Sequence, residues 1–592
     1  MTGKINPFKH DYFIGYISQV LPQFVKIHFP SSVLLNSFTH YGEEYNGGLV
    51  GSFVVIEGDR YGFLGRLVEL SLPESERLSL NEKAFQTNNF HPSGKIEILL
   101  SFDLYNPFNV KKGLSSYPNI GAKVYVSSGE LVQKYMERFG VKPEEEVNTI
   151  TIGKLVSDAN AAVKINMQAL FGRHCAIVGT TGGGKSFTVA KLTESLIGSG
   201  NKVILIDATG EYEGFDALKE TCVSKLVDNS ILHYTNLSIA DLFVMFRPSG
   251  QVQQPTLLEA IKSLRLVSIL KRDKDNFDVT VDGNTATFSF EGKGGSTLHL
   301  EVTNGCLVKL GKTTSAYNRL CALYAKELED PFSIVFDISK LTTQLNNECL
   351  YLNGTSWGAN INQSIQGNIS SLILRIHNTL NDDDFKSLFG FDNIPKTDVS
   401  DKINSFIKDQ KENKKLLRIA FDKVPFSFQV REIIANSIGS LLLKKAREGE
   451  FNSKNKAGNA PIVLIIDEAH QFLNKSVKDE YFENTKLDSF DSIAKECRKH
   501  GLFLCIATQM PRDIPAGTLS QMGTFIVHRL INHFDKEAIA NACSSANRNT
   551  LDFLPILGEG EAILTGVDFA MPIIMKMDKP KNEPNSHTPK LN

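Results

Sequence analysis

The stretch 179–186 carries the residues whose types and spacing most clearly predict chemistry. It reads Gly-Thr-Thr-Gly-Gly-Gly-Lys-Ser and fits the phosphate-binding pattern G-x-x-x-x-G-K-[ST]. Glycines let successive backbone N–H groups turn inward around phosphate oxygens, where a Cβ would block the approach. Lys185 would reach the β- and γ-phosphates, and the Ser186 hydroxyl would bind Mg²⁺. The pattern predicts a site for a nucleoside triphosphate and its metal ion.

The flanking sequence supports this interpretation of the glycine-rich stretch. Residues 175–178 form a short apolar run typical of a buried strand, and Val189, Leu192 and Leu196 recur at helical spacing. A glycine-rich turn with an incidental lysine would not need this order of strand, loop and helix. The residues predicted to contact the nucleotide are Gly179, Thr180, Thr181, Gly182, Gly183, Gly184, Lys185, Ser186 and Phe187.

A second apolar run, residues 461–466, ends in the acids Asp467 and Glu468. We expect Asp467 to hold Mg²⁺ beside Ser186 and Glu468 to orient and deprotonate the attacking water. The alternative is an ordinary strand before a polar loop, which the presence of Lys185 disfavours. His470 is expected to have a supporting role.

Two further strands end in polar residues. Residues 203–206 precede Asp207, so Asp207 and Glu211 are candidates to approach the nucleotide, with a turn-capping aspartate as the alternative. Gln509 follows the apolar run 502–507 and is a candidate sensor of the γ-phosphate. A simple turn hydrogen bond would explain Gln509 equally well.

Composition restricts the class of protein. The 592 residues include 64 Lys plus Arg and 66 Asp plus Glu, so the total charge alone does not indicate nucleic-acid binding. Eight scattered cysteines without a C-x-x-C pair are typical of reduced core residues. No run approaches the roughly 18 apolar residues of a membrane span, and the first residues do not resemble a signal peptide. We expect a cytoplasmic protein without a membrane segment.

The strands and helices expected around these side chains indicate an α/β fold, and the chain divides into five segments. Alternating short strands over 14–127 predict a small β-barrel, so residues 1–150 form an N-terminal barrel domain with a linker near 142–146. Residues 151–214 and 416–565 form the two parts of the ATPase core. Residues 215–415 are a mixed insertion with helices at 257–271 and 371–381, a hairpin or meander within 277–300 and a charged, solvated helix at 402–415. Residues 566–592 form a C-terminal brace and a disordered tail.

The motifs together resemble the HerA-type ATPases. The resemblance is carried by residues 173–186, 206–212, 467–470 and 498–501. It implies a RecA-like P-loop NTPase core, an N-terminal barrel similar to that of F-type ATP synthases, and kinship with the FtsK DNA pumps. It also implies ATP and Mg²⁺ as cofactors, and a homo-hexameric ring that translocates double-stranded DNA.

The resemblance further implies that an arginine completes the ATP site of a neighbouring subunit. The matching positions are Arg173 and Arg498, with Arg529 as a weaker alternative; each could instead be an ordinary surface arginine. Residues 510–512, Met-Pro-Arg, depart from the Arg-Pro that relatives often carry after the glutamine. Family members work with a partner nuclease or NADase-type effector, and bacterial members occur in anti-phage defence.

Three functions are compatible with these motifs. The leading hypothesis is an ATP-driven DNA translocase. The rival is a ring scaffold that uses ATP to assemble and activate an effector, without processive movement on DNA. A conjugation-type secretion ATPase is disfavoured because the sequence shows no membrane segment.

Overall fold

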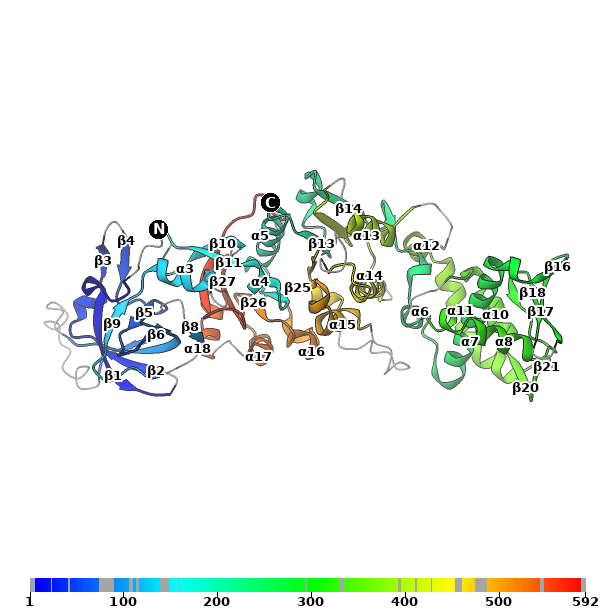
Figure 1. The fold of residues 1–592 in the computed structure, drawn as a ribbon, viewed down its shortest axis with the longest axis horizontal. Coiled ribbons are helices and arrows are strands. Elements are labelled where there is room, and N and C mark those ends of the chain that lie inside the picture. The colour runs from blue at the N-terminus through cyan, green and yellow to red at the C-terminus, as the bar shows by residue number, and fades with distance from the viewer. Residues whose placement is uncertain are drawn as a thin grey trace, which may run out of the picture.

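The computed structural model describes most of the chain and shows three parts along one long axis, the barrel, the ATPase core and the insertion (Figure 1). The described residues are 6–22, 24–40, 43–73, 90–105, 110–112, 116–138, 148–158, 160–292, 295–330, 335–391, 396–409, 413–426, 429–452, 460–473, 487–543 and 548–586. The linker predicted at 142–146 lies outside them.

The N-terminal part is a closed six-stranded barrel, which confirms the prediction. Its strands run in the order β2-β1-β9-β5-β6-β7, and β2 pairs with β7 to close the barrel. Alternation places Val25 and Ile27 inside. The strands are β1 (Phe13–Val20), β2 (Phe24–His28), β5 (Phe53–Ile56), β6 (Tyr61–Ser71), β7 (Ser93–Asp103) and β9 (Lys123–Val126). Helix α3 (Gly129–Arg138) follows.

The ATPase core is an eleven-stranded sheet in the order β11-β10-β28-β27-β26-β12-β25-β24-β13-β23-β14. Strands β26 to β14 are parallel, and β27, β28, β10 and β11 extend the sheet in antiparallel pairs. The parallel strands are β12 (Cys175–Val178), β13 (Lys202–Asp207), β14 (Thr221–Lys225), β23 (Leu416–Ala420), β24 (Ile462–Ile466), β25 (Leu502–Thr508) and β26 (Thr524–His528).

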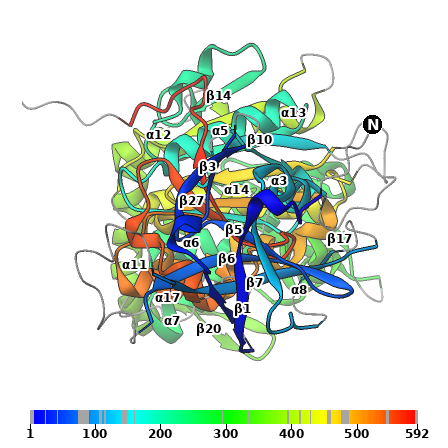
Figure 2. The same ribbon diagram turned by 90° about the vertical axis from the view of Figure 1, so that its left-hand side faces the viewer.

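The central strands are buried on both faces, as their continuous apolar sequences predict. Helix α5 (Lys185–Gly198) packs with one apolar cluster, and helices α14 (Val430–Arg447) and α15 (Ser489–Glu496) pack with the other. Viewed from the barrel end, the barrel strands β1, β5 and β6 lie in front of the ATPase core (Figure 2). All five residues of β24 are buried, so the acids that follow it emerge at a rigid sheet edge.

The ends of the sheet differ from the predicted segments. β14 lies within the predicted insertion, while β27 (Glu561–Gly566) and β28 (Ile573–Met577) carry the core sheet into the predicted brace. On that side β28 pairs with β10 (Thr149–Leu155), beside β11 (Ala162–Asn166). These strands join partners far away in the chain, and local periodicity contains no information about such pairing.

The insertion is a separate lobe of helices and small sheets at the end of the molecule away from the barrel (Figure 1). The predicted hairpin is confirmed as β16 (Asp278–Asp282) and β17 (Thr285–Glu291), followed by β18 (Thr297–Thr303). The helices predicted at 257–271 and 371–381 lie within α7 (Gly250–Arg272) and α11 (Gln363–Asn381). Helices α6 (Ile239–Phe246) and α12 (Asp383–Phe389) lie at its base.

The charged segment 402–415 is not a solvated helix throughout. Helix α13 (Val399–Lys408) buries Val399, Ile403 and Phe406 against the core. The Lys202 ammonium donates to the carbonyls of Phe406 and residues 407 and 409, at 2.8 to 3.0 Å, and so satisfies the C-terminal end of this helix. The spacing of the apolar residues within this charged segment indicates a partly buried helix, which the number of charges alone does not reveal.

The C-terminal segment as far as residue 586 lies against the core instead of leaving it. The backbone N–H groups of Lys581 and Asn582 donate to the Glu194 carboxylate on α5, and Asn585 N donates to the Glu211 carbonyl at 2.8 Å. The prediction of a disordered tail is therefore wrong for residues 579–586. Among the described residues, no helix is long and apolar enough to cross a membrane.

Candidate nucleotide-binding and hydrolysis site

The glycine-rich stretch forms a tight loop between β12 and α5. Gly182 and Gly184 have φ values of 75° and 104°, which disfavour residues with a Cβ. A Cβ on Gly179 would meet the Cβ of His528 at 2.6 Å. Thr180 anchors the loop, because its backbone N–H and its hydroxyl both donate to the Arg529 carbonyl at 3.1 Å. Phe187 lies half-buried in the first turn of α5.

His528 lies beside the phosphate-binding loop and was not among the residues predicted from the sequence. Its Nδ1 donates to the Glu561 carbonyl, and its Nε2 lies against the Thr188 hydroxyl on α5, each at 2.8 Å. Burial, opposed by backbone hydrogen bonding and reinforced by the Lys185 charge, lowers the pKa of His528 to about 4. The imidazole is therefore neutral at pH 7 and bridges β27 to the nucleotide-binding helix.

This buried histidine predicts an acid-sensitive contribution to stability. Its folded pKa of about 4 lies below the ordinary value of 6.5. Between those values the unfolded chain takes up a proton that the folded chain does not, so the contribution is complete above pH 6.5 and falls as the pH decreases. At pH 5 the loss is about 2 kcal/mol.

Urea unfolding followed by circular dichroism at pH 7 and pH 5 measures this loss. The difference in unfolding free energy between the wild-type protein and His528→Gln should be about 2 kcal/mol smaller at pH 5. Comparing the two proteins removes the pH dependence of the remaining groups. An equal difference at both pH values would contradict the assignment of a neutral, buried imidazole.

Lys185 and the two acids after β24 form a buried triad. The Lys185 ammonium lies 2.7 Å from Asp467 Oδ1 and 2.8 Å from Glu468 Oε1. Burial by itself would lower the pKa of Lys185, but the charges and hydrogen bonds of the two carboxylates outweigh it and raise the pKa. Lys185 therefore meets the predicted metal ligand Asp467 and the predicted base Glu468 at one point, although it precedes them by more than 280 residues in the chain.

Gln509 connects this triad to the loop. Its amide Nε2 donates to Glu468 Oε1 at 2.6 Å, and its Oε1 accepts from the Thr181 hydroxyl at 2.7 Å. Glu468 has a positive φ of 46°, a conformation that is rare for a residue with a side chain and is typical of functional sites. His470 Nδ1 lies 3.3 Å from Glu468 Oε2, which fits the supporting role predicted for it.

The donor set fits a nucleotide-bound magnesium ion. Asp467 Oδ2 and Glu211 Oε2 are both buried without a hydrogen-bond partner, and hard carboxylate oxygens are the ligands that Mg²⁺ prefers. Burial raises the pKa of Glu211, while the nearby Ser186 hydroxyl opposes this rise. These oxygens, together with the Ser186 hydroxyl, are the groups that would hold the ion.

Asp207 has a different environment from the one expected. Its carboxylate is fully buried, accepts from Gly210 N and Tyr212 N, and pairs with Arg418 Nε at 2.8 Å. The alternative of a turn-capping aspartate describes Asp207 better than a direct nucleotide contact. Arg418 was missed, although a charged residue within the otherwise apolar β23 was a usable signal.

The candidate arginines lie at opposite ends of the parallel strands. Arg173 and Arg498 precede the parallel strands β12 and β25, so both lie at the edge opposite the phosphate-binding loop. Arg173 is partly buried and pairs with Asp568 at 2.8 Å, whereas Arg498 is exposed and its charge acts on His174. Arg529 instead lies at the loop of its own subunit, where its carbonyl holds Thr180.

Comparison with known proteins agrees with this geometry. Residues 150–292 match the family description "Helicase HerA, central domain", and residues 453–583 match "Helicase HerA-like C-terminal". The DNA double-strand break repair helicase HerA of Saccharolobus solfataricus is 23% identical over 89% of this chain and 87% of its own length. That of Pyrococcus furiosus is 24% identical over 77% and 73%.

Two solved structures are similar to this chain at low sequence identity. VirB4 of Thermoanaerobacter pseudethanolicus is 13% identical, covers 74% of this chain and 98% of its own, and has a TM-score of 0.44. The bacterial conjugative coupling protein TrwB is 11% identical, covers 79% and 95%, and has a TM-score of 0.43. The phosphate-binding loop lies within the first of the two matched segments and the buried acidic pair within the second, so this chain carries domains that match the central and C-terminal domains of HerA helicases.

Proposed function

We propose that the chain hydrolyses ATP with Mg²⁺ as a hexameric motor that translocates double-stranded DNA. The observation that carries the proposal is the buried triad of Lys185, Asp467 and Glu468, joined to the phosphate-binding loop through Gln509. A loop that only binds nucleotide has no need for a positioned base. The HerA name of the relatives supports DNA as the substrate of movement.

The residues have separate roles in hydrolysis. Entry of the triphosphate would give Lys185 phosphate oxygens in place of the carboxylates that it now contacts. Glu468, released from Lys185, would accept a proton from the attacking water, while Gln509 would report the γ-phosphate to the loop. The bound Mg²⁺ supplies neutralisation of phosphate charge, and Ser186 and Asp467 would hold it.

The positions of the arginines support a ring. Arg173 and Arg498 cannot serve the loop of their own subunit from the opposite sheet edge, but an adjacent subunit could receive them. A guanidinium supplied in this way stabilises charge that develops on the γ-phosphate. Composite sites of this kind would couple each hydrolysis event to the position of the next subunit.

We further propose that a nuclease or NADase-type effector works with this ring, in a cytoplasmic setting such as anti-phage defence. The proposal rests on the family resemblance. The rival is a ring scaffold in which ATP controls assembly and activation of the effector. The insertion forms a large lobe on the side away from the barrel and so offers an effector a binding surface outside the motor (Figure 1). This surface supports the scaffold as a second candidate function.

DNA dependence of the ATPase rate tests the proposal. We expect a purified hexamer whose ATPase rate rises with double-stranded DNA. The apparent DNA affinity should fall at least about 10-fold between 50 and 200 mM salt, because phosphate contacts release counterions. Light scattering gives the mass, and a coupled phosphate assay gives the rate. A hexamer with the same rate with and without DNA would favour the scaffold, and a monomer with full activity would contradict the ring.

A further inference from the structure

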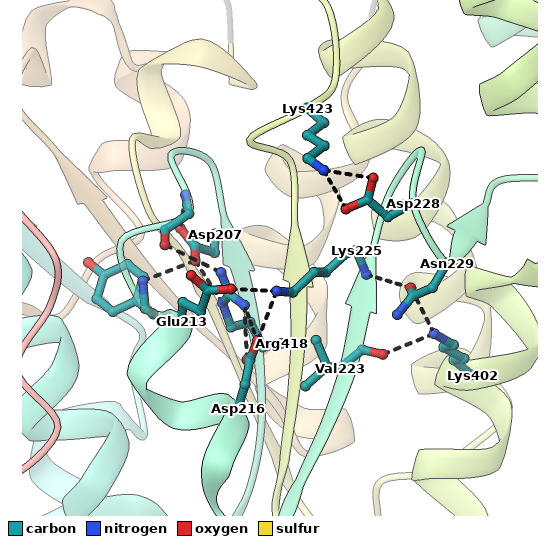
Figure 3. Close-up of polar contacts among 12 residues, drawn as sticks. Asp207, Glu213, Asp216, Val223, Lys225, Asp228, Asn229, Lys402, Arg418 and Lys423 are labelled. Atoms are coloured by element: carbon teal, nitrogen blue, oxygen red, sulfur yellow. Dashed lines mark hydrogen bonds and ion pairs between the residues drawn. The ribbon is translucent and has the colours of Figure 1, made fainter.

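A buried ion network lies beneath the loop that follows β13 (Figure 3). Its centre is Arg418 on β23, which is 1% exposed. Arg418 Nε donates to Asp207 Oδ2 at 2.8 Å, and Nη1 donates to both carboxylate oxygens of Asp216 at 2.9 Å. Burying an arginine is costly unless several charged partners satisfy its fork of donors, so this geometry is specific.

The partner carboxylate of Arg418 organises the backbone of the loop. Asp207 Oδ1 accepts from Gly210 N at 2.8 Å, and Oδ2 accepts from Tyr212 N at 3.1 Å. Gly210 has a φ of 82°, and Arg418 Nη2 also donates to its carbonyl at 3.4 Å. The backbone on both sides of Glu211 is therefore fixed through a carboxylate that Arg418 holds in place.

Glu211 is the side chain that this loop delivers to the nucleotide site. It lies close enough to Ser186, Lys185 and Asp467 for all three to act on its carboxyl group, and its Oε2 is buried without a partner. Its backbone carbonyl is held separately by Asn585 N. The hydrogen bonds of Asp207 and of Asn585 N therefore fix the backbone around Glu211 independently. The unpartnered carboxylate oxygen of Glu211 lies beside the expected metal position.

We propose that Arg418 is a positioning residue for the metal site: through Asp207 it fixes the 207–212 loop and so holds Glu211 toward the Mg²⁺ of the bound nucleotide. Glu211 would act together with Asp467 as a carboxylate ligand, directly or through a water. This inference rests on the proposed Mg²⁺-ATP site and does not depend on DNA translocation. Such supporting contacts typically change metal affinity by 10- to 100-fold.

The network also explains why a lysine would not replace Arg418. The guanidinium serves Asp207 with one nitrogen and Asp216 with another, whereas an ammonium is a single point charge on a flexible chain. Lys225 adds a further contact to this cluster, 3.5 Å from Asp216 Oδ2. Lys423 and Asp228 pair at the exposed surface nearby and do not join Asp207, so they offer a matched control (Figure 3).

Magnesium titration of nucleotide binding tests the inference. A fluorescent ATP analogue is titrated onto the full-length protein in EDTA and at increasing Mg²⁺ concentration. For Arg418→Met we expect the half-maximal Mg²⁺ concentration to rise about 10-fold or more, while the affinity in EDTA changes by less than about twofold. Arg418→Lys should give a smaller rise, and Lys423→Ala none.

A second variant keeps the test decisive if Arg418→Met does not fold. Glu211→Gln removes the carboxylate and leaves the buried Arg418 network intact, and it should raise the Mg²⁺ requirement similarly. An unchanged requirement in Glu211→Gln, or in folded Arg418→Met, would overturn the inference and leave Arg418 with a structural role only. If wild-type binding were itself independent of Mg²⁺, the proposed cofactor, and not this inference alone, would be wrong.

Discussion

Glu468→Gln is expected to lower the ATPase rate by about 10²- to 10⁴-fold, the usual contribution of a positioned general base. The amide cannot accept the proton of the attacking water, but it has nearly the same shape and keeps a contact for Gln509. Lys185 would lose one of its two carboxylate partners and keep Asp467. ATP binding and assembly should therefore persist. Steady-state phosphate release and equilibrium binding of ATP measure the two effects separately.

A matched surface variant controls for the loss of a glutamate. Glu496 pairs with Arg447 at 2.8 Å, and both side chains are nearly half exposed, so Glu496→Gln should leave the rate unchanged. The same pair of variants separates the two proposed functions. Loss of biological function with retained assembly in Glu468→Gln would show that turnover is required. Retained function would favour the scaffold, and an unchanged ATPase rate would remove Glu468 from the catalytic role.

Arg498→Ala is expected to lower the ATPase rate by about 10³-fold or more if its guanidinium reaches the γ-phosphate of a neighbouring subunit. Its position at the sheet edge opposite the phosphate-binding loop makes a contact within the same subunit impossible without a large rearrangement. Arg173→Ala should give a comparable loss if both arginines act there. Each variant is assayed at concentrations where the wild-type protein is fully assembled.

Mixing two inactive variants tests action between subunits. In rings that contain both Arg498→Ala and Glu468→Gln, some interfaces combine an intact Glu468 with an intact Arg498, so activity should return. Arg447→Ala, at an exposed arginine of the same region, should be fully active alone. Absence of recovery in verified mixed rings would indicate that Arg498 acts within its own subunit or only stabilises the fold.

The local features of the ATP site could be predicted from the sequence because each depends on neighbouring residues. Glycines at 182 and 184 are needed for left-handed backbone, and Lys185 and Ser186 follow at the start of the helix. The apolar run before Asp467 predicts a buried strand that ends at the acidic pair. The helices predicted at 257–271 and 371–381 were equally clear, since their periodicity repeats over several turns.

Contacts between distant segments could not be predicted in this way. Asp207 ends its strand as expected, but its partner Arg418 lies 211 residues later, and only sheet pairing brings β13 beside β23. The same holds for Gln509, whose contacts with Thr181 and Glu468 join segments far apart in the chain, and its role as a γ-phosphate sensor stays a prediction. Strands β14 and β28 fell outside the predicted core segments because each joins the sheet through a partner that local periodicity does not reveal.

The sequence alone predicts the chemistry, because the patterns for a phosphate-binding loop, a metal-binding acid and a base each consist of a few adjacent residues. Only the tertiary structure decided which groups share a site and which face away from it. In the folded chain Lys185 pairs with both Asp467 and Glu468, and Asp207 pairs with Arg418. Arg173 and Arg498 lie at the ends of the strands opposite the phosphate-binding loop. The physical reason is that the order of strands in a sheet follows from burial and pairing across the whole chain, which no local pattern encodes.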